Sequence, residues 1–351
     1  MPLITNIYPI YVIGGIGQKI VIAGTGFNDQ QGGSYVSFKD VDVNNYGNYM
    51  DAATCMLFKY IKWTDNEVVV EIPRALTGKV HINIYGIDYE SNDELHVKAT
   101  LKNLTYDPLT ALHLTNQNGI GGYTWYINEE FWNNKRARKA IEDVFEEFRY
   151  KTGANFVLNS APTSNAINCT DKINIIAPDP ALTVTGHCED FTYHWTVNGV
   201  TFKLYEFFKI HITDKENWYY GRGRTPVGSS KFRYVLLHEL GHAHGLHHVI
   251  ENDQTMVGTV IPASMVPWSK RDIITPDEKI AIKFLVKMSQ NFSFRDCGVS
   301  PMTTIRNPFD IYGKYQNHKR PVWLVYKYVA YKLKNLLSLV LQLKLPKLFL
   351  Y

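Results

Sequence analysis

The feature that most constrains this chain is a run of residues in the order H-E-x-x-H-x-x-G-x-x-H, at positions 238–248. If the run begins as a helix, His238 and His242 lie one turn apart on one face, where both imidazoles can reach the same metal ion. Gly245 tolerates the positive φ at which helices often end. The chain can therefore turn there and bring His248 back as a third ligand, which leaves one position of a tetrahedral zinc ion open for water.

Glu239 follows the first of these histidines directly. In this position a carboxylate can take a proton from water at the metal without itself being a ligand. We therefore predict one catalytic zinc ion held by His238, His242 and His248, with Glu239 as the catalytic base. The competing interpretations are a histidine-rich helix without metal and a purely structural zinc site, but structural sites usually complete their ligands with cysteine.

Two further histidines in the run do not fit the ligand spacing. His244 falls on another face of the helix, so it cannot join His238 and His242. His247 stands one residue short of the position that the third ligand requires. We expect both to face solvent or to support the ligands from outside.

The run and the residues after it resemble the metzincin clan of zinc endopeptidases, most closely its matrixin-like and bacterial secreted members. The resemblance implies a methionine packed beneath the metal, and Met256 stands at the expected short distance, with Met265 a weaker candidate. Residues 274–285 resemble the closing helix of the clan. No tyrosine follows Met256 closely, so we assign no residue to the role that a tyrosine has there in some metzincins. The resemblance also implies a polypeptide substrate and a secreted or cell-surface protein, although no signal peptide is visible at the N-terminus.

Residues 1–98 read as about seven short strands separated by glycine-rich turns, which predicts an all-β sandwich. The clearest strands are at 19–24, 35–38, 67–72 and 79–85. The segments 4–9 and 15–27, together with Trp63, resemble the IPT/TIG family of immunoglobulin-like domains. Such domains are usually spacers or binding modules, so this one is expected to contact a surface or glycan at most. We also expect Phe27 to plug the sandwich after its Gly-x-Gly-Phe turn.

Residues 99–310 change to an α/β (α+β) pattern. Apolar residues at helical spacing predict a helix over 133–151 that ends at Gly153. Strands are expected at 155–158, 172–176 and 207–212, followed by a helix from Ser229–Ser230, as a possible cap, to Gly245. A capping box at 275–278 begins another helix. The predicted fold is therefore multi-domain: an immunoglobulin-like sandwich followed by a metzincin-like zinc protease domain.

Residues 311–351 form a C-terminal basic apolar tail of unknown role, and from residue 320 it contains lysines but no acid. The tail is compatible with a membrane-surface segment, with a poorly ordered end, or with sequence foreign to the folded unit. The net charge of +4 and the absence of a basic module exclude a nucleic-acid-binding protein. Of the four cysteines, Cys169 and Cys188 flank a short segment and are compatible with a disulfide or with free thiols, whereas Cys297 is expected to be structural.

We therefore expect a zinc metalloendopeptidase that hydrolyses peptide bonds. An extended substrate would pair with an edge strand near residues 207–212, and the segment between Met256 and Asp272, with Pro262 and Pro267, would wall the neighbouring pocket. The alternatives are a non-catalytic surface-binding or adhesion protein with a degenerate zinc domain, and a zinc hydrolase of non-peptide substrates. A calcium ion is compatible with the sequence, but no ordered calcium loop supports it.

Overall fold

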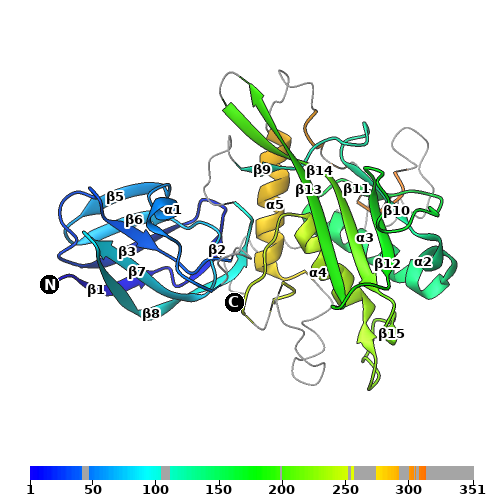
Figure 1. Cartoon of the computed structure of the whole chain (residues 1–351), viewed down its shortest axis with the longest axis horizontal. Helices are drawn as coiled ribbons and strands as arrows, with labels where there is room; N and C mark the ends of the chain where they lie inside the picture. The colour runs from blue at the N-terminus through cyan, green and yellow to red at the C-terminus, as the bar shows by residue number, and fades with distance from the viewer. Residues whose placement is uncertain are drawn as a thin grey trace, which may run out of the picture.

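The computed structural model describes residues 1–41, 47–103, 111–197, 200–251, 254–256, 274–291, 300–303, 305 and 308–313. Figure 1 shows a β-rich N-terminal part beside a larger part in which helices lie against one sheet. The predicted pocket wall between Met256 and Asp272, the weaker candidate Met265, Cys297 and residues 314–351 of the tail lie outside the described residues. No helix within the described ranges is long and apolar enough to cross a membrane.

The N-terminal part consists of two four-stranded sheets around a common core, as the strand pattern predicted. One sheet has the order β1 (Leu3–Tyr8), β3 (Lys19–Thr25), β6 (Glu67–Glu71), β5 (Tyr60–Thr64). The other has the order β2 (Tyr11–Gly14), β8 (Ile87–Thr100), β7 (Gly78–Ile84), β4 (Tyr35–Ser37), and the short helix α1 (Ala52–Cys55) follows β4. Alternate residues of both sheets are buried, because successive side chains of a strand point to opposite faces.

Phe27 occupies this core as expected and is fully buried. Gly26, with φ 77°, provides the turn before it. A Cβ on Gly24 would lie 2.1 Å from the carbonyl oxygen of Leu3 and 2.3 Å from Cζ of Phe27, so only glycine fits there. The Trp63 indole on β5 donates to the carbonyl oxygen of Phe27 at 2.9 Å, which links the turn that carries Phe27 to this strand.

The second part is built on a sheet in the order β11, β10, β12, β14, β13, and β9 also pairs with β14. Its strands are β9 (Leu112–His113), β10 (Tyr123–Ile127), β11 (Phe156–Leu158), β12 (Asn174–Asp179), β13 (Gly186–Val197) and β14 (Val200–Thr213). All of these pairings are parallel except that of β13 with β14. Residues 207–212 form part of β14, but the prediction that they lie at an edge is wrong, since β14 lies between β12 and β13. Strand β14 pairs with β12 on one side and with β13 on the other. This leaves β13 as the edge strand on this side of the sheet.

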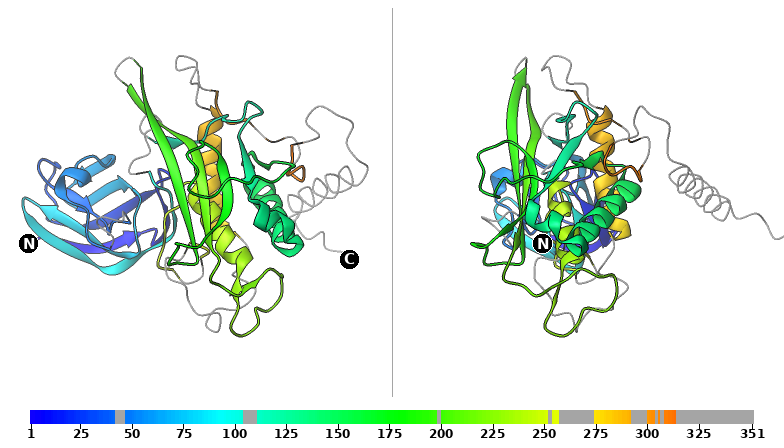
Figure 2. Two further views of the ribbon diagram at one scale, coloured as in Figure 1. Left: turned by 45° about the vertical axis from the view of Figure 1, so that its right-hand side comes forward. Right: turned by 90° about the vertical axis from the view of Figure 1, so that its right-hand side faces the viewer.

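Helices lie against this sheet and complete the core (Figure 2). They are α2 (Glu129–Asn133), α3 (Lys135–Thr152), α4 (Phe232–Ala243) and α5 (Pro276–Asn291). Helix α3 ends at Gly153, with φ 80°, as predicted. It buries the apolar positions that predicted it, and the ring of Phe145 packs at 5.8 Å from that of Trp125 on β10.

The cysteines that the structure describes, Cys55, Cys169 and Cys188, are free, so the Cys169–Cys188 disulfide is not formed. Cys188 lies on the edge strand β13, whereas Cys169 lies in the segment between β11 and β12. Burial raises the pKa of the Cys188 thiol well above its ordinary value, and the nearby Glu239 adds to this effect. A thiol in this environment stays protonated and is a poor nucleophile.

Candidate active site

Helix α4 carries the first half of the histidine run and is buried between α3 and the sheet. The predicted serine cap is wrong, because the helix begins after Lys231 and has no side-chain cap. Ser230 instead belongs to the short strand β16 (Ser230–Lys231), which pairs with β15 (Trp218–Tyr219), and its hydroxyl donates to Glu216. Ser230, which the local sequence favours as a helix cap, is therefore part of a strand pair. The predicted turn at Gly245 is confirmed by its φ of 78°.

The turn brings His248 back to His238 and His242. The Nε2 atom of His248 lies 3.1 Å from Nε2 of His238 and 3.1 Å from Nε2 of His242. Among the described residues these three form the one group of His, Cys, Asp or Glu side chains that could hold a metal ion. Nitrogens about 2.0–2.1 Å from a tetrahedral zinc ion are about 3.4 Å apart, so this spacing fits zinc closely.

Backbone carbonyls orient two of the three rings. His238 donates Nδ1–H to the carbonyl oxygen of Thr255 at 2.9 Å, and His242 donates to that of Leu246 at 2.9 Å. A neutral imidazole that donates from Nδ1 has its lone pair on Nε2. The Nε2 atoms of both residues are therefore acceptors, as a metal requires.

Burial keeps the three rings in the neutral form. It lowers the pKa of His238 to about 4, to which the neighbouring His248 also contributes. The pKa of His242 lies well below its ordinary value through burial and the two neighbouring histidines, and that of His248 is lowered by burial and by the charge of Lys102. Unprotonated imidazole is the form that binds metal.

Glu239 lies on the same helix but outside the group of ligands. It is 5% exposed, and burial raises its pKa to about 8, although a hydrogen bond from the backbone N–H of Cys188 works in the opposite direction. That bond joins the carboxylate to the edge strand β13. A general base must be unprotonated, and a cation held beside Glu239 would favour its carboxylate form.

Gly186 on β13 makes room for this carboxylate. A Cβ at Gly186 would lie 2.6 Å from Cγ1 of Val235 and 2.8 Å from Oε1 of Glu239, both on α4. Gly186 could not be recognised from the sequence, since it is remote in sequence from the helix that it contacts. The edge strand and the predicted base are thus in direct contact.

Met256, which the resemblance places near the metal, packs against Gly241, the residue before His242. It is buried, and a Cβ on Gly241 would lie 2.3 Å from its sulfur, so this glycine permits the close approach. The N–H of Met256 donates to Glu278 at 2.8 Å, and the same carboxylate accepts from the N–H of Thr275 at 2.9 Å. The predicted capping box of α5 is therefore present, and its glutamate also holds the turn that orients His238. Only the capping role could be recognised from the sequence.

His244 is outside the ligand group, as predicted, but it does not face solvent. Its ring is buried and stacks at 4.8 Å on Phe148 and lies 4.2 Å from the ring of Phe156, while Nδ1 donates to the carbonyl oxygen of Leu240 at 2.6 Å. It is therefore a core residue that joins α4 to α3 and β11. His247 is half-buried, and its N–H donates to the carbonyl oxygen of Thr100 at 2.9 Å.

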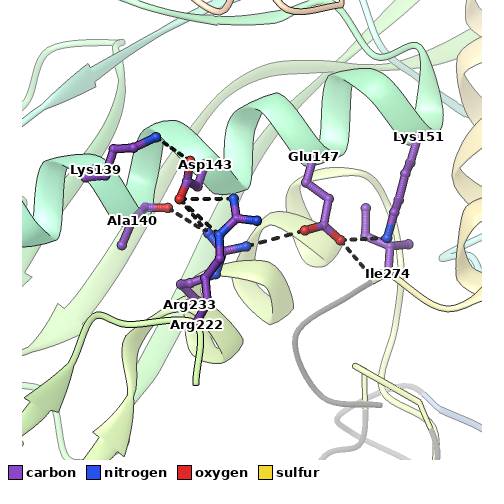
Figure 3. A network of polar contacts seen from close by, with 8 residues as sticks. All are labelled: Lys139, Ala140, Asp143, Glu147, Lys151, Arg222, Arg233 and Ile274. Carbon is purple, nitrogen blue, oxygen red and sulfur yellow. Dashed lines mark hydrogen bonds and ion pairs between the residues drawn. The ribbon is translucent and has the colours of Figure 1, made fainter. Parts of the chain in front are cut away.

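A buried ion-pair network fixes the first turn of α4 (Figure 3). The Arg233 guanidinium is 2% exposed and lies 3.7 Å from Asp143 and 3.4 Å from Glu147, both on α3. Glu147 also accepts from Lys151 at 2.7 Å and from the N–H of Ile274 at 3.2 Å. Helix α4, helix α3 and the start of α5 are thus joined through one carboxylate.

Two family models match the chain at the places where the motifs lie. Residues 195–278 match the matrixin family. Residues 2–98 match the IPT/TIG domain. The matrixin match contains the three histidines, Glu239 and Met256, and the IPT/TIG match contains both N-terminal sheets except the last two residues of β8. The chain thus carries a matrixin-like segment after an N-terminal IPT/TIG domain.

No curated protein matches the chain significantly. Among solved structures, a protein of unknown function from Bacteroides thetaiotaomicron is 13% identical over 28% of this chain and 22% of its own, with a TM-score of 0.23. An auxiliary nutrient binding protein from the same organism is 16% identical over 35% of this chain and 25% of its own, with a TM-score of 0.21. The chain thus spans a quarter or less of these two proteins.

The Arg233 network leads to a stability prediction. Arg233→Met should lower the free energy of unfolding by about 3 kcal/mol, because it leaves the half-buried carboxylates of Asp143 and Glu147 without the buried cation between them. Arg222→Met is the matched control, since Arg222 pairs with the same Asp143 at 3.1 Å but is 69% exposed, and it should cost about 1 kcal/mol or less. Urea denaturation monitored by tryptophan fluorescence measures both, and equal losses would show that burial of the Arg233 pair contributes nothing.

Proposed function

We propose that the chain is a zinc-dependent metalloendopeptidase. The observation that carries the proposal is the convergence of three neutral imidazoles, with Nε2 of His248 3.1 Å from Nε2 of both His238 and His242, beside the buried carboxylate of Glu239. The matrixin match over the same residues points to the same chemistry. Residues 99–310 would then be a metzincin-like catalytic domain with β13 as its antiparallel edge strand, and the protein would act outside the cell or at its surface.

A zinc ion held by His238, His242 and His248 would supply Lewis acidity, which polarises the scissile carbonyl and makes a water molecule nucleophilic at neutral pH. The protein's own contribution begins with Glu239, which accepts the proton of the attacking water. The same carboxylate then delivers the proton to the leaving amine. Its hydrogen bond to the N–H of Cys188 holds it in position between these two transfers.

An extended polypeptide would pair with the outer edge of β13. Backbone hydrogen bonds to such a strand bind a peptide largely independently of its sequence. Gly186 and Cys188 of β13 contact Glu239, so a chain paired along this strand passes next to the base. This arrangement favours a polypeptide over a small non-peptide substrate.

The second candidate is a surface-binding protein with a degenerate zinc domain, in which the IPT/TIG part supplies the function. The intact ligands, base and methionine count against it, because a degenerate site has no need for all five. Chelator-sensitive proteolysis separates the two candidates.

The role of Glu239 can be tested by Glu239→Gln, which keeps the shape and removes the base. We expect proteolysis of a casein substrate to fall by at least about 10²-fold, the range that a positioned acid–base group contributes, while bound zinc remains at one ion per chain. Zinc content by atomic absorption and turnover by fluorescence provide the two readouts. A variant that cleaves at the wild-type rate would exclude this mechanism.

The contact between the base and the edge strand can be tested separately. Gly186→Ala places a methyl group 2.8 Å from Glu239, so the carboxylate must shift, and turnover should fall about tenfold or more with zinc content unchanged. Gly33→Ala is the matched control, because a Cβ there meets nothing within 4 Å and its activity should equal that of the wild type. Full activity in Gly186→Ala would show that the position of Glu239 is not set by β13.

A further inference from the structure

The chain leaves the N-terminal sandwich along β8 and runs directly against the loop that carries the third histidine. Lys102 N donates to the carbonyl oxygen of Gly245 at 2.8 Å, and His247 N donates to that of Thr100 at 2.9 Å. Leu101 and Leu246 form an antiparallel bridge between them. The turn between the second and third ligands is therefore paired, residue by residue, with the end of the sandwich's last long strand.

A second set of contacts holds the other side of His248. Glu251, three residues further on, accepts from Lys98 at 2.9 Å and from the hydroxyl of Thr77 at 3.0 Å, and its carboxylate lies 3.0 Å from Nδ1 of His96. All three partners belong to the IPT/TIG part, and its side chain is 17% exposed. Burial alone would raise the pKa of Glu251, but the hydrogen bonds from Lys98, His96 and Thr77 lower it. The Glu251 carboxylate thus contacts three polar side chains of the sandwich.

A third contact joins the same strand end to the edge strand of the catalytic part. The ammonium of Lys102 forms an ion pair with Asp190 on β13. Asp190 is four residues from Gly186 and therefore lies on the same face of β13, the face that meets α4. The segment 98–102 is accordingly fastened to the loop of the third ligand on one side and to the edge strand on the other.

The hydrophobic core is also continuous across this junction. Ile13 and Ala99 of the sandwich and Leu101 after it belong to the same buried cluster as Leu246 and Leu240. A Cβ at Gly245 would lie 3.0 Å from Leu285 and 3.3 Å from the Tyr205 hydroxyl, so the ligand turn is packed from the catalytic side as well. The turn is therefore packed between the end of the sandwich on one side and Leu285 and Tyr205 on the other.

We propose that the N-terminal IPT/TIG domain positions the third metal ligand, His248, through the segment 96–102 and the carboxylate of Glu251, so that zinc affinity depends on the sandwich. The inference rests on the zinc site of the proposed function. It gives the domain a role within the metal centre, in addition to any contact with an external surface.

The test is zinc affinity of the full chain, measured by competition with a chromogenic chelator. Glu251→Ala should weaken zinc binding by about 10- to 100-fold, the usual effect of removing a group that orients a metal ligand. Glu251→Gln keeps one acceptor oxygen and should give an intermediate affinity. In the cobalt-substituted protein, Glu251→Ala should also reduce the intense visible absorption of a tetrahedral site, since a displaced His248 is replaced by water.

Glu90→Ala is the matched control. Glu90 lies on the same strand β8 and has the same kinds of partner, Lys79 at 2.6 Å and His81 at 3.8 Å, but it is 57% exposed and contacts neither the ligand loop nor α4. Its zinc affinity and cobalt spectrum should equal those of the wild type. Thermal unfolding of the metal-free variants shows whether each is folded.

The outcomes separate this inference from the proposed function. If the wild type binds zinc and Glu251→Ala, folded, binds it within about twofold of the wild type, well short of the loss expected for an orienting group, the positioning role is wrong and the protease proposal stands. If the wild type binds no zinc, both fail. If Glu251→Ala does not fold, Glu251→Gln decides: wild-type affinity and spectrum in that variant overturn the inference, and weaker binding with a weaker spectrum supports it.

Discussion

Unprotonated imidazole nitrogens that converge on one point inside a protein are a favourable arrangement for a metal ion. Carbonyl oxygens accept from Nδ1–H of His238 and His242, which leaves their Nε2 atoms as acceptors, and His248 places its own Nε2 3.1 Å from both, while burial disfavours protonation of all three rings. A buried carboxylate lies beside them. An arrangement of this kind is stabilised by a metal ion, and until the ion binds it must be held by the rest of the fold.

The surrounding fold holds the site through two carboxyl groups, Glu147 and Glu278, each of which has several partners. Glu147 joins Arg233, Lys151 and the N–H of Ile274, and Glu278 accepts from two backbone N–H groups. Each carboxylate therefore connects elements that are far apart in the sequence, Glu147 through ion pairs and Glu278 through hydrogen bonds from backbone N–H groups. Glu147 holds the first turn of α4 through Arg233, and Glu278 holds the turn at Met256.

Local interactions explain why much of this could be predicted. The ligand spacing depends on the helical period, the turn depends on the tolerance of Gly245 for positive φ, and the cap of α5 depends on two residues three apart. The errors arose where a tertiary contact overrides a local preference. Ser230 pairs in a strand and does not cap α4, and His244 stacks in the core, because β15 and Phe148 respectively are brought next to them by the fold.

The sequence by itself determined which three histidines could converge, which glutamate and methionine would accompany them, and that a matrixin-like segment follows an IPT/TIG domain, since each depends on residues close together along the chain. The tertiary structure alone decided which strand forms the edge beside Glu239, why position 186 is glycine, and that Glu251 is bound by the N-terminal sandwich. These features join residues tens to more than a hundred positions apart. No local pattern encodes such a meeting, because it exists only once the strands have paired and the two parts have packed together.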